Sequence, residues 1–151
     1  MNSYGLIDLH CDTLAEYWKY AHTGNPDTLD DPGRVLSLSN MPKDVHWAQF
    51  YAVFIPDEER GQAAIDCFEK NRANFYRQME KFGDRVAPCR NADDMEKAWA
   101  AGKTAAFLTI ENGSVLAGDL SRVHTLAEQG VRAITLTWNG ENELGSGHTT
   151  D

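Results

Sequence analysis

The regular alternation of strand-like and helix-like segments is the feature of this sequence that most restricts its fold. Four short, largely apolar segments have the length and composition of buried strands: residues 4–10, 48–55, 104–111 and 131–137. They are separated by stretches with helical periodicity or helix-boundary residues, at residues 13–21, 60–82, 91–102 and 119–129. Strands that alternate with helices pair in parallel through right-handed crossovers. We therefore predict an α/β fold, either doubly wound or a barrel.

The segment at residues 60–82 carries the clearest helical pattern. Its large apolar residues recur at spacings near three, four and seven, namely Ile65, Phe68, Phe75, Met79 and Phe82. This stripe predicts a long amphipathic helix with one buried face. Two weaker segments, residues 35–39 and 85–88, are predicted to be additional short strands.

The charge balance and the cysteine content exclude several classes of partner. Fourteen Lys and Arg against 23 Asp and Glu give a formal charge of -9, which argues against nucleic acid or an anionic membrane surface as a partner. Three scattered cysteines, Cys11, Cys67 and Cys89, form neither a disulfide framework nor a zinc ribbon, so buried thiols in a reducing compartment are predicted. Because no basic leader or long apolar run is present, a cytoplasmic location without a membrane span is expected.

The sharpest local motif is DLHCDT at residues 8–13, where the first predicted strand ends. Side chains two apart on a strand point to the same side, so His10 and Asp12 can present a nitrogen and an oxygen to one point. The carboxyl ends of parallel strands are also where barrel and doubly wound enzymes hold their active sites. These residues are therefore a candidate metal-ligand pair. The alternative is an Asp that caps the following helix beside a partly buried His.

A second carboxylate stands where another apolar strand ends. The strand at residues 104–111 runs directly into Glu111, which Asn-Gly follows. The two oxygens of a Glu can bridge two divalent ions, which one His and one Asp do not easily do alone. The alternative is an acidic residue that the dipole of the following helix stabilises.

Taken together, these motifs resemble those of the membrane (renal) dipeptidases, a family of zinc peptidases in the amidohydrolase superfamily. The resemblance is carried by four segments in the order of the family: IDLHCDT (7–13), AQFYAVF (48–54), LTIENG (108–113) and GVRAITLTWN (130–139). It covers nearly the whole chain and is far more specific than any one motif.

The resemblance implies a (β/α)8 barrel that hydrolyses dipeptides at a binuclear zinc centre. By the resemblance, His10 and Asp12 bind one zinc ion, while Glu111 bridges both ions and orients the surroundings of the nucleophile. Two later His and a late Asp, which handles the proton in the family, lie outside these 151 residues. Where some members have a His that contacts the substrate, this chain has Trp138, which donates only through its indole N–H. We interpret Trp138 as a substrate-binding residue that alters substrate preference.

The length of the chain bears on this interpretation. Such barrels need around 250 residues, and four strong strands leave an open edge. Residues 1–151 are therefore expected to form the N-terminal part of one barrel domain, either truncated or completed by another chain or a second copy. Two other functions remain open. One is an amidohydrolase that acts on a cyclic amide, lactone or phosphoester, and the other is a catalytically inactive fragment or interaction domain.

Overall fold

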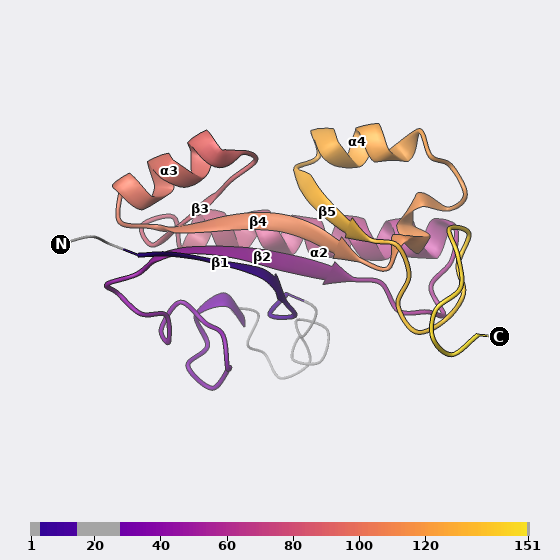
Figure 1. Cartoon of the computed structure of the whole chain (residues 1–151), viewed down its shortest axis with the longest axis horizontal. Coiled ribbons are helices and arrows are strands. Elements are labelled where there is room, and N and C mark those ends of the chain that lie inside the picture. The colour runs from indigo at the N-terminus through magenta and orange to yellow at the C-terminus, as the bar shows by residue number, and fades with distance from the viewer. Residues whose placement is uncertain (1–3, 15–27, 151) are drawn as a thin grey trace.

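The computed structural model describes residues 4–14 and 28–150 of the chain, which form a parallel α/β structure (Figure 1). The strands are β1 (Gly5–Cys11), β2 (His46–Phe54), β3 (Val86–Pro88), β4 (Thr104–Glu111) and β5 (Val131–Thr135). The helices are α2 (Gln62–Lys81), α3 (Ala92–Ala100) and α4 (Arg122–Glu128), with two 3-10 helices, η2 (Thr28–Asp30) and η3 (Gly113–Leu116). The helix predicted at residues 13–21 lies almost entirely outside the described residues.

Every strand pairing in the sheet is parallel, as the alternating pattern predicted. β2 lies between β1 and β4. The other edge of β4 is shared by two strands: β3 pairs with its first half, where Val86 faces Thr104, and β5 pairs with its second half, where Ile134 faces Ile110. The short strand predicted at residues 85–88 is thus confirmed as β3. Because all the strands run the same way, their carboxyl ends gather at one edge of the sheet.

The helix α2 covers one face of the sheet and confirms the predicted amphipathic stripe. Phe68, Phe75 and Met79 on its inner side are buried. They belong to the same apolar cluster as Tyr51 and Leu108 of the neighbouring strands. In Figure 1, α2 lies behind the sheet. This face therefore holds the main hydrophobic core.

The opposite face of the sheet is covered at the amino ends of the strands by α3. Ala98 of this helix clusters with Ala105 and Phe107, which alternate along β4 with residues that face α2. Asn91 caps α3, because its side chain accepts the backbone N–H of Asp94. The carboxyl ends of the strands on this face are left for the candidate site. None of the described helices is long and apolar enough to cross a membrane.

Residues 35–39, predicted to be a strand, are not one. The structure has turns and bends there, and the Val35 side chain is fully exposed. The segment folds back on η2, with Leu38 N–H donating to the Leu29 carbonyl (2.8 Å) and Asn40 Nδ2 donating to the Arg34 carbonyl (2.7 Å). Local hydrogen bonds therefore outweigh a short alternating pattern that no neighbouring strand pairs with.

An ion pair joins η2 to the residue just before β3. Arg85 donates two hydrogen bonds to Asp30, from Nη1 to Oδ1 (2.9 Å) and from Nη2 to Oδ2 (2.6 Å). The guanidinium holds the pKa of the Asp30 carboxyl below its ordinary value of 3.8. A carboxyl with a depressed pKa contributes stability above its unfolded-state pKa and loses it as the pH falls through the folded-state value.

We expect Arg85→Gln to lower the free energy of unfolding by about 1 kcal/mol at pH 7, since solvent screens this half-exposed pair. The difference from wild type should shrink as the pH falls through the folded-state pKa of Asp30, because protonation removes the charge that Arg85 pairs with. Urea unfolding at a series of pH values from neutral to acidic checks this expectation. Arg72→Gln, which removes a pair within α2, is the matched control. A deficit in Arg85→Gln that stayed constant with pH would contradict the role of Asp30.

Candidate metal centre

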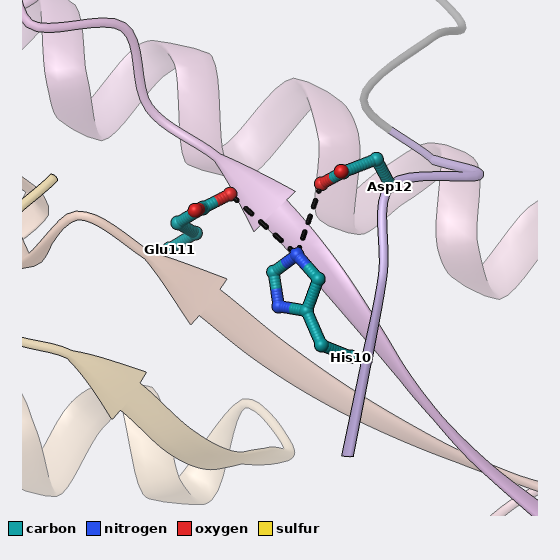
Figure 2. Close-up of side chains that lie close together, drawn as sticks. All are labelled: His10, Asp12 and Glu111. Atoms are coloured by element: carbon teal, nitrogen blue, oxygen red, sulfur yellow. Dashed lines mark hydrogen bonds and ion pairs between the residues drawn. The ribbon is translucent and has the colours of Figure 1, made fainter. Parts of the chain in front are cut away.

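Three potential metal ligands converge at the carboxyl ends of β1 and β4. His10 lies near the end of β1, Asp12 directly follows that strand, and Glu111 is the last residue of β4. His10 Nε2 lies 3.2 Å from Asp12 Oδ1 and 3.7 Å from Glu111 Oε2 (Figure 2). One ligand atom from each residue lies within 4.8 Å of the other two. The side chains that the sequence singled out therefore reach one point across β2.

A register shift in β1 determines which face His10 and Asp12 occupy. Asp8 pairs with Gln49, yet Cys11, three residues later, pairs with Tyr51, only two residues later. Cys11 consequently packs against the core on the α2 side, where Tyr51 is buried. Its neighbours His10 and Asp12 face the other way, toward Glu111. Alternation along the strand predicted that His10 and Asp12 lie on the same face of the sheet. The register shift in β1 determines which face that is.

Cys11 stands between two candidate ligands without belonging to the cluster. Burial raises the pKa of its thiol to about 12, so the group is neutral at physiological pH. Zinc takes cysteine as the thiolate, which this environment disfavours. Cys67 is partly buried and Cys89 is buried, both as free thiols. All three cysteines are therefore unbridged, as predicted, but only Cys89 is buried, whereas Cys11 and Cys67 are partly buried.

The electrostatics of the centre favour a cation. Burial raises the pKa of the Glu111 carboxyl above its ordinary value, His10 lowers it, and Asp12 raises it. Two carboxylates that point at one place repel each other, and a divalent ion between them relieves this repulsion. One imidazole nitrogen and two carboxylate groups form a donor set that zinc accepts. The residues present therefore fit a zinc ion.

The two alternatives to metal binding stand differently. Whether Asp12 caps a following helix stays untested, because that predicted helix lies almost entirely outside the described residues. The His10 side chain is 46% exposed. Asn112, not Glu111, caps the helix that follows β4, because its side chain accepts the Ser114 backbone N–H (3.2 Å). That helix is a single 3-10 turn, which the sequence did not predict. Both acidic side chains are thus left facing His10.

Trp138 lies on the same face as the cluster. It follows β5 and packs edge-on against Phe54, with the ring centroids 4.8 Å apart. Phe54 pairs with Glu111 in the register of β2 and β4. The indole is 40% exposed, so part of it remains available beside the candidate ligands.

A known family of proteins matches the whole of this chain. The sequence model of the membrane dipeptidases, peptidase family M19, matches residues 1–151. The chain belongs to the membrane dipeptidase family. The resemblance seen in its motifs is therefore confirmed, and the family to which the chain belongs is one of metallo-dipeptidases.

Solved structures of dipeptidases share the fold. A metallopeptidase from Rhodobacter sphaeroides, liganded with a phosphinate mimic of the dipeptide L-Ala-D-Ala, is similar with a TM-score of 0.78 and 16% identity, over 93% of this chain and 47% of its own. The dipeptidase AC of family M19 matches with a TM-score of 0.77 and 18% identity, over 91% of this chain and 44% of its own. The probable dipeptidase PvdM from Pseudomonas aeruginosa matches with a TM-score of 0.65 and 19% identity, over 93% and 35%.

These similarities show that the parallel sheet corresponds to part of a TIM barrel, as the resemblance implied. The chain spans less than half the length of each of the three dipeptidases. Of the two architectures that the alternating segments allowed, the barrel is therefore correct.

The sequence did not predict a role for three polar residues near the centre. Asp57 follows β2, Asn112 follows Glu111, and Asn142 lies in the segment after β5. Their side chains are joined by hydrogen bonds, from Asn112 Nδ2 to Asp57 Oδ1 (3.2 Å) and from Asn142 Nδ2 to Asn112 Oδ1 (2.9 Å). Asx residues after strands are ordinary turn formers. Only the Asn-Gly pair at the end of β4 hinted at a special backbone there.

Proposed function

We propose that the protein containing this chain is a zinc-dependent dipeptidase with a binuclear centre, to which this chain contributes His10, Asp12 and Glu111. The observation that carries the proposal is the convergence of these three side chains to within 4.8 Å. Membership of the dipeptidase family supports it. Dipeptides as substrates are supported by the related metallopeptidase that binds a dipeptide mimic.

Each residue has a distinct proposed role. His10 and Asp12 would hold one zinc ion, and Glu111, with its two oxygens, would bridge both ions and orient the groups around the nucleophile. Zinc, when bound, supplies a Lewis acid that polarises the scissile carbonyl and makes water a nucleophile near neutral pH. Among the described residues, these three form the only such cluster of potential ligands. We therefore propose that residues 1–151 are the N-terminal part of one barrel, whose remaining part supplies the other ligands and the proton-handling group.

The substrate side of the centre is proposed to include Trp138. Its half-exposed ring packs on Phe54, which pairs with Glu111 in the sheet, and it offers an apolar surface and one indole donor. An aromatic surface of this kind contacts a substrate side chain and excludes water from the reacting centre.

We expect Trp138→Ala to raise KM for dipeptides roughly tenfold, which corresponds to about 1.4 kcal/mol of lost binding. The zinc content should not change, because Trp138 is not a proposed ligand. Steady-state kinetics of the zinc-loaded full-length protein and metal analysis check both parts. Leu136→Ala, which removes a 64% exposed side chain in the same segment, is the control. An unchanged KM across a panel of dipeptides would remove Trp138 from the substrate site.

The function itself is tested with the zinc-loaded full-length protein. We expect hydrolysis of dipeptides in a panel that includes D-residues at the C-terminal position, and loss of this hydrolysis after removal of zinc with a chelator. Parallel assays with a cyclic amide, a lactone and a phosphoester cover the wider amidohydrolase chemistry. Cleavage of one of these with no turnover of any dipeptide would overturn the peptidase proposal. No turnover of any of these substrates by zinc-loaded protein would favour an inactive or binding role.

A further inference from the structure

The loop after β5 is held by side chains from two other segments of the chain. We call residues 136–145 the β5 loop. Three consecutive residues of this loop are each bonded to a different side chain. The bonds run from Gly140 N–H to Asp57 Oδ2 (2.8 Å), from Arg60 Nη2 to the Glu141 carbonyl (2.8 Å) and from Asn142 Nδ2 to Asn112 Oδ1 (2.9 Å).

Asn112 is the centre of this arrangement. Its side chain is fully buried, and its backbone has a φ of 80°, in the left-handed region. Its Nδ2 donates to the Ile55 carbonyl (2.9 Å) and to Asp57 Oδ1 (3.2 Å), while its Oδ1 accepts from Ser114 and Asn142. An amide that uses all of its donors and both acceptor positions in the interior is held in one orientation. It joins the segment after β2 to the β5 loop.

The bonded part of the loop lies close in the chain or in space to both Glu111 and Trp138, the proposed metal ligand and the proposed substrate-binding residue. Asn112 directly follows Glu111, whose backbone carbonyl accepts Ile55 N–H (3.0 Å). Gly140 comes two residues after Trp138, and the Asp57 carboxylate that holds it is only three residues beyond Phe54, against which Trp138 packs. The same set of bonds therefore fixes where the indole stands relative to the Glu111 carboxylate.

The bonds from Asp57 and Arg60 are additional to those that the β5 loop forms within itself. Asn142 and Gly145 already form an isolated antiparallel bridge, and Asn142 Oδ1 accepts Leu144 N–H (2.8 Å). The hydrogen bonds from Asp57 and Arg60 instead reach residues about eighty positions further along the chain, close to the half-exposed ring of Trp138. Ordering such a loop in advance removes an entropic cost that the substrate would otherwise meet on binding.

We propose that Asp57 and Asn112 are positioning residues that hold Trp138 beside the metal centre and thereby set the affinity for the substrate. The inference rests on the proposed dipeptidase function. Neither residue is among the proposed metal ligands. Their effect is expected in KM, through the position of the indole, and in neither the zinc content nor kcat.

The test replaces the Asp57 carboxylate, whose side chain is 25% exposed. We expect Asp57→Ala to raise KM for dipeptides roughly tenfold, with kcat within about twofold of wild type and an unchanged zinc content. Asp57→Asn keeps an acceptor for Gly140 N–H and should fall between Ala and wild type. Asp66→Ala, which removes an exposed carboxylate that accepts a local bond from Gln62 on α2, is the matched control.

A double variant shows whether Asp57 acts through Trp138. If it does, Asp57→Ala combined with Trp138→Ala should bind dipeptides no more weakly than Trp138→Ala alone. Independent, additive increases in KM would overturn the proposal, as would an unchanged KM in Asp57→Ala.

One readout does not depend on catalysis. The Gly140 amide should exchange with solvent about tenfold faster in Asp57→Ala than in wild type, because its acceptor is gone. Unchanged exchange would overturn the proposal even in an active enzyme. If the wild-type protein turned over no dipeptide, the proposed function would fail, and the role of Asp57 in setting substrate affinity would fail with it. Amide exchange would then still report whether Asp57 holds the loop.

Discussion

Glu111→Gln is expected to reduce dipeptide hydrolysis by the zinc-loaded full-length protein at least about a thousandfold. A glutamine offers one neutral carbonyl oxygen where the proposed bridge needs two anionic ones. The zinc content per chain should fall together with activity. Steady-state kinetics and metal analysis of the same preparation measure both quantities.

The stability of the metal-free protein separates this effect from misfolding. Burial raises the pKa of Glu111 in the folded state, so its ionised form opposes folding above that pKa. Without metal, Glu111→Gln should therefore melt at or slightly above the temperature of wild type, whereas the increase in melting temperature on adding zinc should be lost. Glu128→Gln, at an exposed position on α4, should behave like wild type in every assay. Full activity with normal zinc content in Glu111→Gln would refute the bridging role.

Phe68→Ala is expected to lower the free energy of unfolding by about 3–5 kcal/mol. Phe68 is completely buried on the inner face of α2, within the apolar cluster that joins this helix to β2 and β4. Truncation removes the transfer free energy of the ring and leaves a cavity that the close-packed sheet cannot fill. Urea unfolding of the metal-free protein at neutral pH measures the loss.

An exposed apolar residue provides the comparison for this truncation. Leu120 lies just before α4 with 68% of its surface exposed, so Leu120→Ala should change the free energy of unfolding by less than about 0.5 kcal/mol. Similar losses in the two variants would mean that α2 is not packed on the sheet as described.

Much of the fold could be predicted from the sequence because several segments carry a strong pattern of their own. β2 and β4 are largely buried on both faces, so each is a mostly apolar run, and the stripe on α2 repeats along the helix. Residues 35–39 lacked such support. Their alternation covers only a few residues, and bonds to η2 and within the segment decide their conformation instead.

The candidate site was predictable to the extent that local rules apply to it. His10, Asp12 and Glu111 each follow or end an apolar strand, and parallel strands bring their carboxyl ends to one edge. The network around Asn112 was not predictable, because its partners, Asp57 and Asn142, are 55 and 30 residues away in the chain. Nothing in the spacing of these polar residues indicates that they meet.

The sequence by itself determined the class of fold, the parallel direction of the strands and the identity of the residues that converge at the strand ends. These properties follow from side-chain periodicity and from the spacing of residues that are close in sequence, and both can be read within a single segment. Only the tertiary structure decided that β3 and β5 share one edge of β4, that the shift in β1 turns His10 toward Glu111, and that the β5 loop is tied beside them. Such features depend on pairing and packing between distant segments, where many arrangements satisfy the same local pattern and the buried core selects one.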